Sequence, residues 1–147
     1  MVDLQQIPNQ TIPVISGGRA FLRGNPGLHA VDLATHAKIW TAAGSFTGTP
    51  AVGGGRVYAI SNQAVLAFNE ANGAAVRTYQ ASTTLKGQPV LTGDVLLVAS
   101  STNTYLFDLA TGSLRQNIPY GGSLSLTDER LFIATSAGDL RTYLVPY

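Results

Sequence analysis

Residues 48–80, GTPAVGGGRVYAISNQAVLAFNEANGAAVRTYQ, contain one full copy of the pattern that decides the fold. Three interruptions rich in glycine or polar residues, at 53–55, 61–63 and 70–73, divide it into apolar segments of strand length. Glycine, asparagine and serine at this spacing are typical of hairpin turns. The stretch therefore predicts four antiparallel strands, at 48–53, 56–61, 64–69 and 74–80.

The same pattern recurs on both sides of this stretch. Its first half returns as TIPVISGGRAFL from residue 11, GQPVLTGDVLLVA from residue 87 and GSLSLTDERLFIA from residue 122. Its second half returns as LHAVDLATHAKIW from residue 28 and LFDLATGSLRQNI from residue 106. Pro13, Pro50 and Pro89 follow one another at intervals of 37 and 39 residues. The 147 residues thus hold four copies, the last of them shortened.

The second strand of each copy is apolar without a break, as at 57–60, 95–99 and 131–134. A sheet with one wet face would alternate, so unbroken apolarity indicates cover on both faces. We therefore predict an all-β fold, a β-propeller of four-stranded antiparallel blades, with four blades per chain. A stacked solenoid would instead repeat every 20–30 residues or so. The expected blades are approximately 9–42, 43–80, 81–119 and 120–147, in one domain.

The phase of the repeat predicts how the ring closes. The last copy ends after its third strand, whereas the segment 2–7 resembles the fourth strand of the third copy, because each ends in isoleucine and proline. Strand 2–7 can complete the last blade in two ways. One chain can close as a four-bladed ring, or two chains can exchange strand 2–7 in an eight-bladed homodimer. We favour the homodimer, since a four-bladed ring demands a quarter turn per blade.

Composition limits the classes of partner. Charged residues make up 12% of the chain and the net charge is +1, so we expect no nucleic-acid partner. The longest apolar runs have five residues and the N-terminal residues do not resemble a signal peptide, so we expect no membrane insertion. Cysteine is absent, which excludes disulfides and thiolate metal sites.

Two sequence motifs resemble the quinoprotein-type repeat, also called the PQQ-like repeat. The matching residues are Leu28, Ala30, Asp32, Ala34, Thr35 and Trp40, then Pro50, Ala51, Val52, Gly54, Val57 and Tyr58, with Asp108, Ala110, Thr111 and Gly112 in the third copy. The resemblance implies a propeller, in a family that typically has seven or eight blades. That family includes quinone-dependent alcohol dehydrogenases and non-enzymatic scaffolds of bacterial outer-membrane assembly. The resemblance alone favours a periplasmic or secreted location.

The chain lacks the residues on which the quinone chemistry of the family's enzymes depends. The quinone enzymes have a vicinal cysteine pair, a tryptophan under the quinone and a calcium held by carboxylates. This chain has no cysteine and a single tryptophan at a repeat position, and His36 replaces a turn glycine. We therefore expect no enzyme activity, no cofactor and no cofactor-binding residue.

The recurrent polar and aromatic residues have structural interpretations. Asp32, Asn69 and Asp108 end the third strand of successive copies, where we expect their side chains to accept hydrogen bonds from turn amides. Trp40 and Tyr79 share one position in the fourth strand, which predicts packing between blades.

We predict no catalytic or metal-binding residue. His29 and His36 lie seven residues apart, without the cysteine or acidic cluster that would complete a metal site. The acidic pair 128–129 is expected to be a solvated hairpin tip. Three arginines can ring one rim and hold an anion, although we favour soluble turn residues: Arg19, Arg56 and Arg130.

The sequence thus predicts a non-enzymatic propeller that offers its loop faces to a protein partner, as an interaction or assembly scaffold. The alternative is a propeller that binds a small ligand or a glycan. Aromatic residues gathered at one mouth would favour that alternative, and Phe46, Tyr105 and Tyr120 fall near turns. A divergent quinoprotein fragment is the least favoured hypothesis. The pattern names neither the partner nor the ligand.

Overall fold

The computed structural model describes residues 12–24 and 27–145, which form antiparallel sheets joined in chain order. The first sheet contains β1 (Val14–Ser16), β2 (Arg19–Gly24), β3 (Gly27–Asp32) and β4 (Lys38–Ala42). The second contains β5 (Thr47–Gly53), β6 (Arg56–Ser61), β7 (Ala64–Asn69) and β8 (Ala75–Gln80). The third contains β9 (Leu85–Thr92), β10 (Val95–Ser100), β11 (Thr104–Asp108) and β12 (Leu114–Ile118). The fourth contains β13 (Gly122–Leu126), β14 (Arg130–Thr135) and β15 (Leu140–Leu144).

The strands confirm the predicted all-β fold of four blades. In the second sheet, the observed strands differ from the predicted ones by one residue at two of their ends. The fourth sheet has three strands among the described residues, as the shortened last copy predicts. The segment 2–7, which we expect to complete it, lies outside the described residues. The described part of the chain contains no helix, and so none long and apolar enough to cross a membrane.

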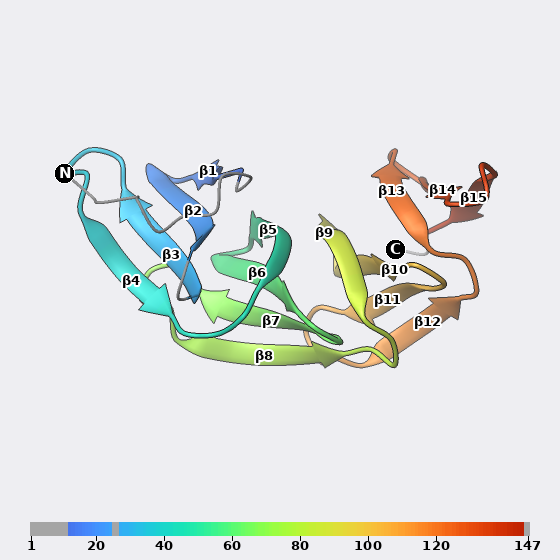
Figure 1. Cartoon of the computed structure of the whole chain (residues 1–147), viewed down its shortest axis with the longest axis horizontal. Coiled ribbons are helices and arrows are strands. Elements are labelled where there is room, and N and C mark those ends of the chain that lie inside the picture. The colour runs from blue at the N-terminus through green and yellow to red at the C-terminus, as the bar shows by residue number, and fades with distance from the viewer. Residues whose placement is uncertain (1–11, 25–26, 146–147) are drawn as a thin grey trace.

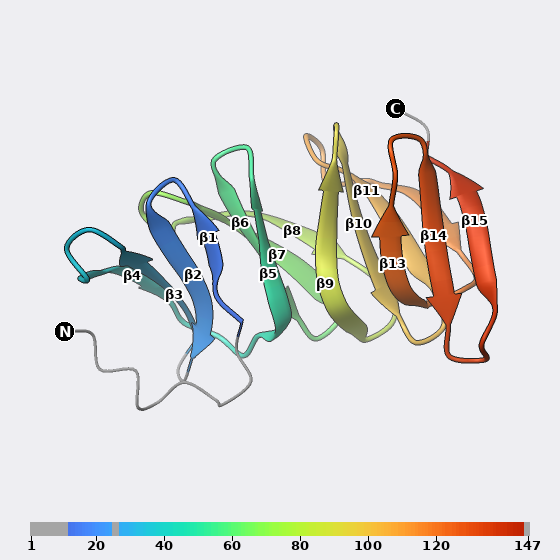
Figure 2. The same ribbon diagram turned by 90° about the horizontal axis from the view of Figure 1, so that it is seen from above.

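The sheets stand side by side along an open arc (Figure 1). Their first strands line the concave side, and β4, β8 and β12 lie on the convex side. The principal contacts between sheets link only consecutive sheets, through strands such as β5 and β9. Seen from above, the first and fourth sheets stand at opposite ends of the row (Figure 2). The described residues therefore form an open arc rather than a closed ring of four blades.

The core consists of three apolar clusters, one between each pair of neighbouring sheets. In β6, Val57 and Ala59 belong to the cluster shared with the first sheet, whereas Tyr58 and Ile60 belong to the cluster shared with the third. All four side chains are buried. Because successive residues of a strand point to opposite faces, the unbroken apolar run supplies both clusters, as predicted.

The turn between the third and fourth strands confirms the predicted role of its recurrent polar side chains. The Oδ1 atom of Asp32 accepts hydrogen bonds from the backbone N–H groups of Ala34 and Thr35, at 2.9 and 2.8 Å. Asn69 and Asp108 do the same in their own copies. At the end of this turn φ is +58° at His36, where the other two copies have glycine at +72° and +80°. The recurrent carboxylates and amides thus hold turns.

Candidate functional site

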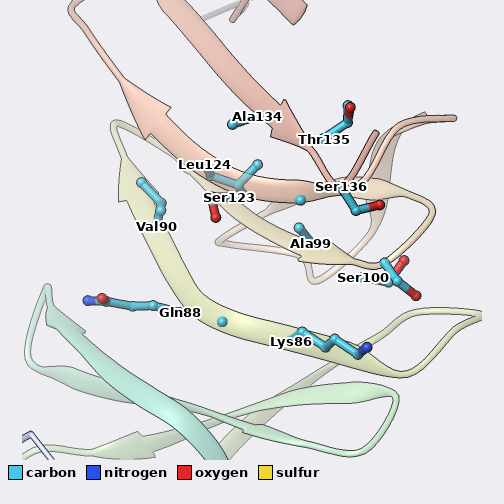
Figure 3. Close-up of a pocket in the computed structure, with 13 residues that line it drawn as sticks. Lys86, Gln88, Val90, Ala99, Ser100, Ser123, Leu124, Ala134, Thr135 and Ser136 are labelled. Atoms are coloured by element: carbon cyan, nitrogen blue, oxygen red, sulfur yellow. The ribbon is translucent and has the colours of Figure 1, made fainter. Parts of the chain in front are cut away.

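A groove with a volume of about 710 Å³ lies between the third and fourth sheets (Figure 3). Its walls come from β9, β10, β13 and β14 and from the turns beside them. Polar lining residues include Lys86, Gln88, Ser100, Ser123, Thr135 and Ser136. Val90, Ala99, Leu124 and Ala134 provide apolar lining. The groove can therefore hold a polar ligand through hydroxyl and amide hydrogen bonds.

A second groove of about 470 Å³ lies between the second and third sheets, at the same end of the strands. It is lined by Ser45, Thr47, Ser61, Asn62 and Thr84, and it shares Lys86 and Gly87 with the first groove. Among the described residues that line either groove, Lys86 has the one ionisable side chain. The two linings thus offer a cation and many hydroxyl groups, without a paired acid and base for proton transfer.

Charged residues gather at the opposite end of the strands, where the other turns meet. The guanidinium of Arg115 joins two carboxylates: Nη1 lies 3.1 Å from Oδ1 of Asp94, and Nε lies 3.1 Å from Oδ2 of Asp108. Hydrogen bonds from Thr111, and then from Arg115, lower the pKa of Asp108 to about 2. Hydrogen bonding to Arg115 also lowers the pKa of Asp94. The guanidinium offsets one of the two carboxylate charges and joins the two turns.

The three candidate rim arginines begin the second strands of the first, second and fourth sheets. Nη1 of Arg19 lies 3.4 Å from Oε1 of Glu70, in the turn of the next sheet. This ion pair engages the guanidinium of Arg19 in a contact between two sheets. The contact favours the interpretation of Arg19 as a turn residue over a ring of arginines that holds an anion. Asp128 and Glu129 are exposed at a hairpin tip.

The two histidines are not brought together into a site. Nδ1 of His29, on β3, lies 2.9 Å from Oγ1 of Thr41, while His36 is exposed in the following turn. Burial, and then the charge of Lys38, lower the pKa of His29. Within residues 12–24 and 27–145, no three histidine, aspartate or glutamate side chains converge as a metal site would require.

The three aromatic residues near turns serve packing. Tyr105 is buried, and its hydroxyl lies 2.7 Å from Oγ1 of Thr83. Phe46 is also buried and meets Phe68 edge to face, with ring centroids 5.8 Å apart. The guanidinium of Arg141 covers the ring of Tyr120 at 4.6 Å. These residues therefore do not form an open stacking platform for a sugar.

Two cross-sheet hydrogen bonds join neighbouring sheets, at the positions predicted to pack between blades. The indole Nε1 of Trp40 donates to the backbone oxygen of Glu70, and the hydroxyl of Tyr79 donates to that of Leu109, both at 2.9 Å. The strand registers correct the predicted equivalence of Trp40 and Tyr79, because Trp40 aligns with Arg77 and lies two residues before the position of Tyr79. Ile118 on β12 is the equivalent of Tyr79 and has no polar group to donate. Ile118 therefore cannot supply the connection that Tyr79 makes between the second and third sheets.

The two ends of the arc carry sheet faces that sequence reasoning overlooked. We call the side toward the following sheet the forward face and the side toward the preceding sheet the rear face. Strand registers place Phe132, Ala134, Leu140 and Thr142 on the forward face of the fourth sheet. They place Ala20, Leu22, His29 and Val31 on the rear face of the first sheet. The alternation of residues along the repeated strands could have identified both faces.

Comparison with known proteins identifies the repeat. The family model described as outer membrane protein assembly factor BamB matches residues 2–142. The crystal structure of BamB from Moraxella catarrhalis aligns with a TM-score of 0.77 at 17% identity, covering 90% of this chain and 42% of that one. No curated protein sequence matches the chain.

Two computationally designed proteins have the same fold at 10% identity. The crystal structure of the designed Ika8 protein aligns with a TM-score of 0.79 over 90% of this chain and 45% of its own. That of the designed Ika4 protein aligns with a TM-score of 0.78 over 99% of both chains. The chain thus spans less than half of the BamB and Ika8 chains and nearly all of the Ika4 chain.

Proposed function

The chain belongs to the family of the outer membrane protein assembly factor BamB, and from this we propose that it is a non-enzymatic assembly scaffold. The observation that carries this proposal is the open arc, whose two ends present blade faces with no sheet against them among the described residues. Uncovered blade faces of this kind suit a module that associates with other protein chains. Its loop ends remain free for a protein partner.

We propose further that two copies close an eight-bladed ring, with strand 2–7 of each copy beside β15 of the other. β15 pairs with β14 along one edge only, and its other edge meets no strand among the described residues. The lengths agree, since one copy spans 42% of BamB and 45% of Ika8. An exchanged strand would cover an edge that otherwise invites aggregation.

The mass in solution tests this ring. Light scattering during size-exclusion chromatography should give twice the 15.4 kDa of one chain. A mass of one chain would overturn the homodimer.

Strand exchange requires a separate test. Neighbouring N–H groups of a strand point in opposite directions, so one of any two adjacent residues donates a hydrogen bond to the paired strand. Proline has no N–H group, so the double substitution Gln5→Pro and Gln6→Pro removes one of these hydrogen bonds in either register. We expect this variant to lose the dimer or to aggregate through β15. The matched variant Gln5→Thr and Gln6→Thr, which keeps both donors, should remain dimeric. Dimers of equal stability in both variants would refute the exchange.

The non-enzymatic role has a direct test against the quinoprotein alternative. Purified protein incubated with pyrroloquinoline quinone and calcium should gain no bound-quinone absorbance and should not support dye-linked oxidation of alcohols. Either signal would overturn the scaffold assignment.

The hydroxyl-lined grooves favour a second candidate function, the binding of a small polar ligand or a glycan. Lys86 lines both grooves, so Lys86→Ala should weaken the binding of such a ligand. Lys38→Ala, on outer strand β4, should leave the binding unchanged. A glycan array without a hit would count against this candidate.

We also propose an extracytoplasmic location, in the periplasm or secreted. Its support is the family description, which names an outer-membrane assembly factor. Fractionation of cells that express the full protein at its natural level should recover it outside the cytoplasm. Recovery with the cytoplasmic fraction would refute the proposed location and would leave the fold assignment unchanged.

A further inference from the structure

We infer that the forward face of the fourth sheet docks on the rear face of the first sheet of a second copy, as one more blade-to-blade interface. This inference rests on the proposed two-copy ring and identifies the surface that holds it together. It concerns sheet faces, and so it is distinct from the exchange of strand 2–7 along a sheet edge.

The first argument is the equivalence of the open face to the internal ones. Tyr58 pairs with Ala67 and Ile60 with Val65 across β6 and β7. These four residues form the forward face of the second sheet and are at most 3% exposed against the third. Phe132 pairs with Thr142 and Ala134 with Leu140 in the same register of the fourth sheet. The fourth sheet thus repeats a face that elsewhere is a core.

The second argument is exposure. Leu140 is 66% exposed, although its equivalent Val65 is fully buried. At the other end of the arc Ile15 is 66% exposed, whereas its equivalents Val52 and Leu91 pack against the clusters between sheets. Large apolar side chains exposed at equivalent positions indicate a surface that becomes buried on association.

The third argument is the chemistry of the opposing face. The rear face of the first sheet has Ala20 and Leu22, which are 8% and 7% exposed within one copy, and Val31. The internal rear faces have Val57 and Ala59 or Leu96 and Val98. Polar side chains interrupt both end faces: Ser123, Ser125 and Thr142 on the forward side, and His29, Lys38 and Thr41 on the rear side. Both end faces therefore keep apolar side chains at positions that form the internal cores, with polar side chains beside them.

The occupant is a second copy because the two faces are complementary but lie at opposite ends of one arc. The open arc keeps them apart within a single chain (Figure 1). Two copies joined head to tail bring both pairs of faces together, and the association ends when the ring closes.

The test uses Leu140→Asp and Ile15→Asp, one on each face, with Leu114→Asp as the matched control. Leu114 is 49% exposed at the start of outer strand β12, away from both end faces. A buried carboxylate in place of leucine or isoleucine should weaken the dimer by about a hundredfold or more. The control should dissociate like the parent in a dilution series followed by sedimentation equilibrium.

Circular dichroism separates dissociation from unfolding. Both face variants should keep the parent spectrum, because the replaced side chains are already exposed within one copy. If the parent is a dimer and the face variants dissociate no more readily than the control, the face docking is wrong while the homodimer stands. If the parent is a monomer, the proposed ring and the docking both fail.

The cysteine-free chain permits a second measurement on folded protein. A variant carrying both Leu140→Cys and Ile15→Cys, treated with a short bis-maleimide, should yield a covalent dimer as its end product. Absence of cross-links in a dimeric sample would overturn the docking. A ladder of longer oligomers would contradict closure by two copies.

Discussion

Gly48 and Gly87 occupy the same place in consecutive repeats, yet alanine should affect them very differently. Both have positive φ, +69° and +79°. A Cβ atom at Gly48 would lie 1.7 Å from the backbone oxygen of Gly87, whereas a Cβ at Gly87 would meet nothing within 4 Å. The pair therefore isolates the effect of a close approach between β5 and β9 from the effect of backbone conformation.

The expected magnitudes follow from these contacts. A left-handed conformation costs a non-glycine residue about 1–2 kcal/mol, partly offset because alanine restricts the unfolded chain, so Gly87→Ala should cost about 1 kcal/mol. At Gly48 the contact must open from 1.7 Å to at least 3.0 Å, which displaces one backbone from another. Overpacking of this kind adds about 2–3 kcal/mol, so Gly48→Ala should cost about 3–4 kcal/mol.

Urea unfolding followed by circular dichroism measures both differences in the free energy of unfolding. Gly54→Ala is a second control, since its φ is +59° and its Cβ would also meet nothing within 4 Å. It should behave like Gly87→Ala. Equal losses of stability in all three variants would refute the close approach of β5 and β9.

Three further predictions concern turns and sheet connections. Tyr79→Phe removes the hydrogen bond to Leu109 and should cost about 1 kcal/mol in urea unfolding, whereas Tyr58→Phe, whose hydroxyl has no partner among the described residues, should cost less. Because the pKa of Asp108 falls from 3.8 to about 2 on folding, its ionised carboxylate stabilises the fold above pH 4, and this stabilisation declines as the pH falls toward 2. Arg115→Gln should make the free energy of unfolding less dependent on pH in this range. An unchanged pH profile would contradict the role of Arg115 in lowering this pKa. His36→Gly relieves a positive φ and should raise the melting temperature, while a lower value would refute strain at that turn.

The repeat was sufficient to predict the sheets because its signals are local. Glycine or asparagine lies in most of the turns, and the apolar run at 57–60 marks a strand covered on both sides. The residues that hold turns were predictable for the same reason, since Asp32 bonds to amides only two and three residues away.

The grooves and the connections between sheets were not predictable in this way. Lys86 lines two grooves whose remaining walls come from distant segments, and no spacing in the sequence joins them. Arg115 likewise meets Asp94 through the fold, across 21 residues of chain. The pairing of β9 with β10 shifts register between Leu97 and Ala99, and the repeat pattern does not encode this irregularity.

The unequal chemistry of the two strand ends gives the proposed ring a direction. One end carries the ion-paired turns around Arg115, and the other carries the hydroxyl-lined grooves around Lys86. Head-to-tail closure relates the copies by an axis through the centre of the ring, so both copies place the same end on the same side. The disc thus has two unlike surfaces. A flat neighbour such as a membrane or a larger complex would meet one surface or the other, and the ring would bind with a fixed orientation.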